Sequence, residues 1–97
     1  MKTRPDLPRS PADLTILRWG YKKARELARR LGVYRGEYLP GHPAFADGSA
    51  ARCHDEAMPV DISAPDIVYT DEDNAAIDAF TRKFGRRDYV RLTFILI

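Results

Sequence analysis

The residue types that most often bind metals or act as nucleophiles gather between positions 42 and 56 of this 97-residue chain. They are His42, Cys53, His54, Asp55 and Glu56. A closed metal site usually draws its ligands from paired spacings such as Cys-x-x-Cys or His-x-x-x-His, because such pairs fix the geometry. This region contains no such pair, so we predict no metal site here.

A thiol nucleophile is the other chemistry that this region suggests, because Cys53 stands beside His54. Adjacent side chains seldom point at the same atom, and the sequence offers no third group to orient the histidine. Cys53 is the only cysteine, so no intrachain disulfide can form. We predict a plain, partly buried thiol and assign no catalytic residue.

Lysine and arginine follow one side of the segment 11–31, where they could track the phosphates of a nucleic acid. The net charge is only +2, and no zinc-finger or RNA-recognition signature accompanies them. We expect a solvated or internally paired side, with Glu26 pairing with Lys22 and Arg30, and no nucleic acid as partner. The basic residues are Arg18, Lys22, Lys23, Arg25, Arg29 and Arg30.

The same segment has the apolar periodicity of an amphipathic helix over 11–31. Ser10 can cap its start, Pro11 suits the first helical position, and Gly32 is the expected stop. Apolar residues recur at spacings of three and four and should face a partner. They are Leu14, Leu17, Tyr21, Ala24, Ala28 and Leu31, with Leu27 widening the stripe.

Trp19 and Gly20 stand side by side within this helix. A large aromatic side chain next to a glycine is typical of a helix that packs closely against another segment. We predict that Trp19 packs in this way and does not stack on a nucleic-acid base.

A second helix is predicted over 71–84. Thr70 is the expected cap, and the carboxylates of residues 71–73 oppose the positive end of the helix dipole, which explains them without a bound cation. Cations and a following glycine suit its C-terminal end, namely Arg82, Lys83 and Gly85. The expected buried stripe consists of Ile77, Phe80 and Phe84.

The remaining segments give weaker signals. Residues 33–43 read as a loop with half-buried aromatic side chains, 47–49 as a turn, and 50–58 as one or two short helical turns. Residues 66–69 suggest a short extended piece, and partial alternation over 89–97 predicts a C-terminal strand. The predicted fold class is therefore an α+β fragment, with two main helices joined by a long loop that contains proline and glycine.

Two ordered blocks of the sequence resemble a known family. The first runs through residues 13–30 and continues at 34–37 and 42–45, and the second is 64–78. Both resemble the C-terminal, substrate-binding portion of fungal FAD-dependent alcohol (methanol) oxidases of the glucose–methanol–choline (GMC) oxidoreductase family. The resemblance implies helices packed on a sheet, a primary alcohol as substrate, and a flavin that passes electrons to oxygen, giving aldehyde and hydrogen peroxide.

The sequence departs from the family where the family's chemistry lies. A Trp-His element with the catalytic histidine should follow the second helix, but no histidine occurs after His54. The Gly-x-Gly-x-x-Gly loop that would hold the FAD pyrophosphate is also absent. The resemblance therefore assigns no catalytic, cofactor-binding or metal residue. We expect a truncated fragment that neither binds FAD nor oxidises alcohols alone; the alternative is a small binding module that uses the basic side of 11–31.

The expected organisation is a flexible lead-in over 1–10, a partial GMC C-terminal domain over 11–84, and a divergent apolar tail over 85–97. Exposed apolar surfaces could drive self-association. No apolar run is long enough to span a bilayer, and neither a signal peptide nor a C-terminal peroxisomal signal is recognisable. The sequence therefore predicts no membrane partner and assigns no compartment.

Overall fold

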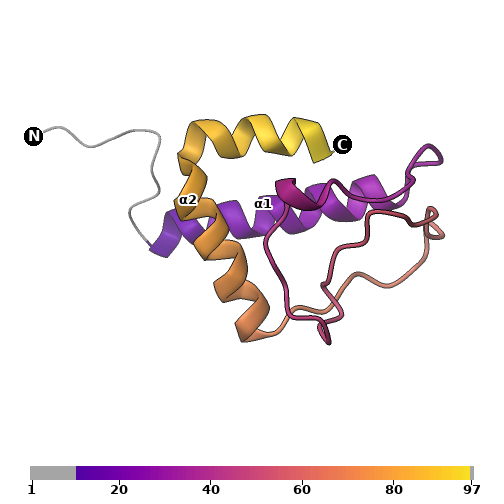
Figure 1. Ribbon diagram of the computed structural model, residues 1–97, viewed down its shortest axis with the longest axis horizontal. Helices are drawn as coiled ribbons and strands as arrows, with labels where there is room; N and C mark the ends of the chain where they lie inside the picture. Colours follow the sequence, from indigo (N-terminus) through magenta and orange to yellow (C-terminus); the bar gives the residue numbers. More distant parts are fainter. Residues whose placement is uncertain (1–10, 97) are drawn as a thin grey trace, which may run out of the picture.

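Two long helices joined by a folded-back loop make up the structure (Figure 1). The computed structural model describes residues 11–96, with the side chains of residues 13–83. Helix α1 spans Pro11–Arg29, a short 3-10 helix η1 spans Leu39–Gly41, and helix α2 spans Asp71–Leu96. The predicted lead-in over 1–10, with its cap Ser10, lies outside the described residues.

The core forms where the first half of α2 packs on α1. Tyr21 of α1 and Ile77 of α2 are almost completely buried at its centre. Three partly buried side chains pack around this pair, namely Leu17, Phe45 and Tyr69. Phe45 and Tyr69 come from the connecting loop, so the loop completes a core that two helices alone would leave open.

An ion pair links the two helices at the edge of the core. The Arg18 guanidinium donates from Nε and Nη2 to the two carboxylate oxygens of Asp78, at 3.1 and 2.7 Å. Such a two-point contact fixes the relative orientation of the helices as well as their distance.

The predicted apolar stripe of α1 is confirmed over most of its length. Leu14, Tyr21, Ala24 and Ala28 are buried. Leu27 and Leu31 are exposed, however. A rotation of about 100° per residue places Leu27 roughly 60° from Ala24 and roughly 100° from Ala28, on the edge of the buried face, and Leu31 lies beyond the end of α1 at Arg29. Including Leu27 and Leu31 in the buried stripe was wrong.

The prediction for Trp19 and Gly20 is also wrong. Trp19 is 63% exposed. A Cβ atom added at Gly20 would meet nothing within 4 Å, so no segment approaches the helix closely there. Glycine at this position therefore reflects no packing requirement.

Helix α1 ends without the predicted glycine stop. Its last turn tightens, with Arg30 N donating to Leu27 O and Leu31 N to Ala28 O, each at 3.2 Å. These bonds satisfy carbonyls that would otherwise be left unpaired. Gly32 does not adopt the left-handed conformation of a C′ glycine, so the predicted role of Gly32 is wrong.

The start of α2 confirms the sequence prediction. Asp73 N donates to Thr70 Oγ1 at 3.1 Å, and Thr70 N donates to the Asp73 carboxylate at 3.0 Å. This reciprocal pair is a capping box, and it accounts for the carboxylate at position 73. Ile77 is buried and Phe80 partly buried as predicted, whereas the side chain of Phe84 lies outside the described set.

The predicted end of α2 is wrong. The helix continues to Leu96, so Gly85 does not end it, and Arg82 and Lys83 lie in its interior. The ribbon changes direction between its orange and yellow parts but remains helical (Figure 1). One glycine weakens a helix by about 1 kcal/mol without ending it, and a helix already started by a strong cap extends at low cost.

The α+β fold class is wrong for the same reason. Residues 11–96 contain helices and connecting segments but no strand, and the predicted strand over 89–97 is helical as far as Leu96. The segment 66–69 has no regular secondary structure. A lone strand leaves its backbone groups without partners, whereas a helix pairs them internally. The described part of the chain is an all-helical unit with a long loop.

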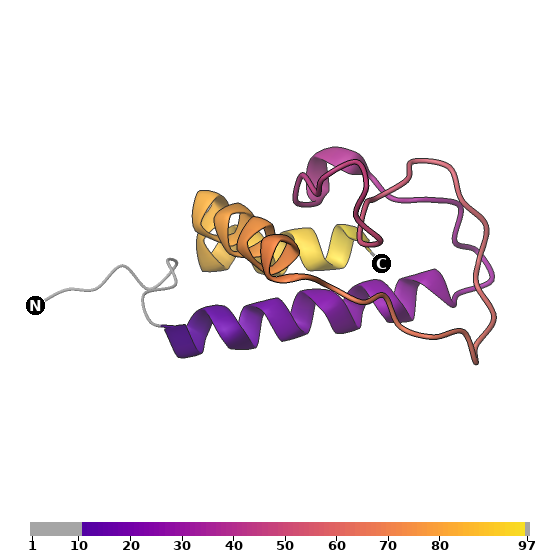
Figure 2. The same ribbon diagram turned by 90° about the horizontal axis from the view of Figure 1, so that it is seen from below.

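The connecting loop extends past the end of α1 and folds back along it, as Figure 2 shows. Backbone hydrogen bonds hold it: Glu37 N to His54 O at 2.8 Å, Ala57 N to Arg35 O at 3.1 Å, and Val60 N to Arg29 O at 2.9 Å. These bonds bring the segments around residues 37 and 54 side by side.

The loop matches the sequence predictions in part. The turn over 47–49 is confirmed, with Ser49 N donating to Ala46 O at 3.0 Å. Residues 50–58 form no helix beyond a turn at their start, so that prediction is wrong. Tyr34 is half-buried as predicted, whereas Tyr38 is 62% exposed.

Candidate functional site

Polar side chains from α1 and from the connecting loop meet where the loop folds back along α1. We call them the buried polar cluster, which consists of Tyr21, Arg25, Glu37, His42 and Cys53. Tyr21 and Arg25 come from α1, one turn apart, and the other three come from the loop. Such a concentration of buried polar groups is the most distinctive chemical feature of the described residues.

An ion pair between Arg25 and Glu37 anchors the cluster. Arg25 Nε lies 2.6 Å from Glu37 Oε2, and Arg25 Nη2 lies 3.2 Å from Oε1. Burial alone would raise the pKa of Glu37, but the Arg25 guanidinium outweighs it and lowers the pKa below the usual value. Glu37 is therefore ionised at neutral pH.

Arg25 makes further contacts that explain why it can be buried. It donates to Tyr69 Oη and to the backbone oxygen of Arg52, each at 3.2 Å, and its guanidinium lies over the Phe45 ring. Buried charges are tolerated where they are paired and hydrogen-bonded in this way. Of the two expectations for the basic side, solvated or internally paired, the second holds for Arg25, which is only 3% exposed and is paired with Glu37.

Tyr21 and His42 form the second contact of the cluster. Tyr21 Oη lies 2.6 Å from His42 Nδ1, and the two rings meet edge to face. Burial lowers the pKa of His42 to about 4, so its imidazole is neutral at pH 7. The other ring nitrogen, Nε2, is buried and has no hydrogen-bond partner in the described part of the structure.

Cys53 lies close to both histidine and carboxylate. A carboxylate oxygen of Glu37, a ring nitrogen of His42 and Cys53 Sγ all lie within 4.8 Å of one another. Burial raises the pKa of Cys53 to about 12, so it is a thiol at neutral pH. The predicted partly buried thiol is confirmed.

The structure sorts the five residues that the sequence grouped. It brings His42 and Cys53 together but leaves His54, Asp55 and Glu56 exposed. Glu37 was missed, because it stands outside the stretch 42–56 and no ligand spacing connects it to Cys53. The one signal in the sequence is an acidic side chain in a loop rich in aromatic residues. A carboxylate that is buried among them would require a charged or hydrogen-bonding partner.

The four arginines on the basic side of α1 form ion pairs within the chain. Besides Arg18 and Arg25, both Arg29 and Arg30 form ion pairs with Glu26, and Arg30 also pairs with Asp66 at 3.1 Å. The predicted pair of Glu26 and Arg30 is thus confirmed. Lys22 instead lies over the Tyr69 ring, with Nζ 4.5 Å from the ring centroid.

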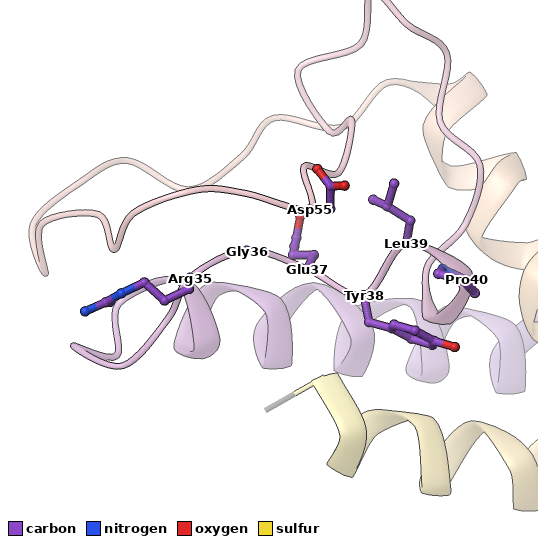
Figure 3. Close-up of a pocket in the computed structure, with 7 residues that line it drawn as sticks. All are labelled: Arg35, Gly36, Glu37, Tyr38, Leu39, Pro40 and Asp55. Atoms are coloured by element: carbon purple, nitrogen blue, oxygen red, sulfur yellow. The ribbon is translucent and has the colours of Figure 1, made fainter.

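Open hollows adjoin the cluster. One of about 530 Å³ is lined by exposed or half-buried residues of the loop, and Glu37 reaches it (Figure 3). A second, of about 200 Å³, is lined by Arg25, Glu37 and His54 among others. Glu37 is thus the member of the cluster that lines both of these hollows.

Comparisons with known proteins show that the chain is similar in sequence to fungal alcohol oxidases. It is 46% identical to alcohol oxidase of Pichia angusta over 43 residues, which is 44% of this chain and 6% of that protein. It is 26% identical to alcohol oxidase 1 and 25% identical to alcohol oxidase 2 of Komagataella phaffii over 117 aligned positions, which include 81% of this chain.

The chain spans only 18% of the length of the two Komagataella relatives. No protein-family model matches it, and no solved structure matches it significantly. Among the described residues, neither long helix has a stretch apolar enough to cross a bilayer.

Proposed function

We propose that this chain is part of an FAD-dependent alcohol oxidase of the GMC family, with residues 11–84 taken from the substrate-binding portion. The observation that supports the proposal is the similarity to alcohol oxidases over 81% of the chain. The whole enzyme would transfer hydride from a primary alcohol to the flavin and reduce oxygen to hydrogen peroxide.

The residues present do not fit the flavin itself. A pyrophosphate is usually held by a glycine-rich loop at a helix N-terminus, and the sequence contains no Gly-x-Gly-x-x-Gly. The N-terminus of α2 carries three carboxylates, Asp71, Glu72 and Asp73, which would repel it. We therefore derive no step of a flavin reaction from this chain.

His42 does not fit the catalytic acid/base either. A general base must reach the substrate and have a pKa near the working pH. His42 is 6% exposed and already bonded to Tyr21, and its pKa of about 4 is far below that range. The function proposed for this chain is therefore structural: its loop, tied to α1 by Arg25 and Glu37, forms a packed unit within the larger enzyme.

Peroxide formation by the purified chain tests the catalytic part of this proposal. With added FAD, a primary alcohol and oxygen, we expect no alcohol-dependent hydrogen peroxide. A rate that depends on the alcohol and disappears when Glu37 or His42 is replaced would overturn the assignment of a purely structural role.

A chimera tests the assignment to the enzyme. The aligned segment of Komagataella phaffii alcohol oxidase 1 is replaced by residues 13–83 of this chain. We expect the chimera to retain flavin absorbance, and the same chimera with Ile77→Asp to lose it, because Ile77 is fully buried in the core. A folded chimera without flavin would contradict the proposal.

The alternative of a small nucleic-acid-binding module has less support. Ion pairs within the chain neutralise most of the basic side of α1, so few charges remain to release counterions from phosphates. Salt-dependent retention of RNA or DNA that is lost on Lys23→Glu would favour this alternative.

A further inference from the structure

Three ligand types from separate parts of the loop meet in the buried polar cluster. Glu37 follows α1, His42 directly follows η1, and Cys53 lies farther along the chain. Their donor atoms, one oxygen, one nitrogen and one sulfur, lie within 4.8 Å of one another. Neither the alcohol oxidase relationship nor the structural role proposed above accounts for this convergence.

We propose that Glu37, His42 and Cys53 bind a zinc ion, with water as a fourth ligand. Zn²⁺ is the common protein metal that accepts thiolate, imidazole and carboxylate in one tetrahedral site. Magnesium and calcium prefer oxygen ligands alone, so a site with a thiolate and an imidazole selects against them. Three protein ligands and one water make an open site, which lies next to the hollows that Glu37 lines.

The surroundings of His42 support a role as ligand. Histidine ligands usually have their second ring nitrogen held by a hydrogen bond, which fixes the ring and its tautomer. The contact with Tyr21 Oη supplies such a bond at Nδ1. Nε2 is buried and has no hydrogen-bond partner among the described residues, so the ring has an unpaired polar atom that could serve as the ligand.

The neighbouring Arg25 is compatible with a bound cation. A carboxylate has about four acceptor positions, so Glu37 can bridge Arg25 and a metal ion. On binding, the S–H bond of Cys53 breaks, a Zn–S bond forms and one proton goes to solvent, so the thiolate and the Glu37 carboxylate neutralise the ion.

The site must contract to bind the ion. With Zn–S bonds of about 2.3 Å and Zn–N bonds of about 2.0 to 2.1 Å, a tetrahedral arrangement places two donors about 3.6 Å apart. The three donors lie within 4.8 Å of one another, and the residues that carry them lie in segments without regular secondary structure. Side-chain movements of about 1 Å would close the site.

Metal titration of the 97-residue chain tests the proposal. The reduced, chelator-treated protein is titrated with Zn²⁺ against a chromophoric chelator, and separately with Co²⁺ as a spectroscopic probe. We expect one equivalent to bind, with a thiolate-to-cobalt charge-transfer band and release of about one proton. Excess Mg²⁺ should not compete.

Variants with matched controls identify the ligands. We expect Cys53→Ser and His42→Gln each to weaken Zn²⁺ binding by about 100-fold or more, and Cys53→Ser to abolish the charge-transfer band. His54→Gln is the control for His42, and Glu56→Gln is the control for Glu37→Gln, because both control residues are exposed. Circular dichroism checks that each variant folds, and if His42→Gln does not, the nearly isosteric Cys53→Ser decides.

Three results would contradict the proposed zinc site. Less than one equivalent of Zn²⁺ bound, or the same affinity in wild type and Cys53→Ser, would overturn the proposal. An equal loss with His54→Gln would overturn it too, because the ligands would then be the adjacent pair Cys53 and His54. None of these results depends on alcohol oxidation, so the proposed function is tested separately.

Discussion

Arg25 of α1 and Glu37 of the connecting loop form a buried ion pair, with Nε and Oε2 2.6 Å apart and side-chain exposures of 3% and 7%. The pair ties the loop to the helix and forms one side of the cluster that contains His42 and Cys53. The stability of the unit should therefore depend strongly on it.

We predict that Glu37→Gln lowers the free energy of unfolding by about 3 kcal/mol. The substitution leaves the Arg25 charge buried without a counterion, which is the costly way to break such a pair. The measurement is urea unfolding followed by circular dichroism, in the presence of a chelator. Glu56→Gln is the control, because Glu56 is exposed. Equal midpoints for the two variants would show that the pair contributes nothing.

Gly36 should tolerate no side chain. Its φ is +131°, and an added Cβ would lie 2.3 Å from the backbone oxygen of Asp55. We predict that Gly36→Ala destabilises the chain by about 2 kcal/mol or more, because it adds backbone strain to a clash with main chain that cannot move aside. Gly48→Ala, where an added Cβ meets nothing, should stay within about 0.5 kcal/mol of wild type. Similar unfolding midpoints for both variants would disprove the close approach of residues 36 and 55.

Gly20 should behave in the opposite way. It lies inside α1, and an added Cβ would meet nothing within 4 Å. We predict that Gly20→Ala stabilises the chain by about 0.5 to 1 kcal/mol, because alanine restricts the unfolded chain and favours helix. Thermal unfolding measures the change, and a lower melting temperature would mean that another segment does pack at Gly20.

Asp73 should make the stability depend on acid pH. Burial would raise its pKa, but hydrogen bonds from Thr70 and Ser49 outweigh it and hold the pKa below the usual value of an aspartate. The folded state thus binds this proton less readily than the unfolded state. The stabilisation is present above the unfolded pKa and is lost as the pH falls through the folded pKa.

We therefore predict that Asp73→Asn is less stable than wild type at pH 7 and that the difference shrinks below about pH 4. Unfolding in urea at several pH values measures it. Asp47→Asn, at an exposed turn, is the control and should show no such convergence. A constant difference between Asp73→Asn and wild type at all pH values would contradict the assigned pKa direction.

The sequence alone determined the features that depend on neighbouring residues. The start of α2 follows from Thr70 and Asp73, which are three positions apart and bond to each other. The turn at 47–49 and the pair of Glu26 with Arg30 are equally local. In each case, the interacting groups lie within one turn of chain, so residue type and spacing suffice to predict the contact.

The tertiary structure decided what depends on distant residues. Burial of Arg25 rests on Glu37 and Tyr69, and the meeting of Glu37, His42 and Cys53 depends on how the loop folds back over α1. The helical state of the segment beyond Gly85 likewise depends on whether a strand partner exists, which the local pattern does not state. Such contacts join residues separated by long stretches of irregular chain, and their formation is set by packing, which residue spacing does not encode.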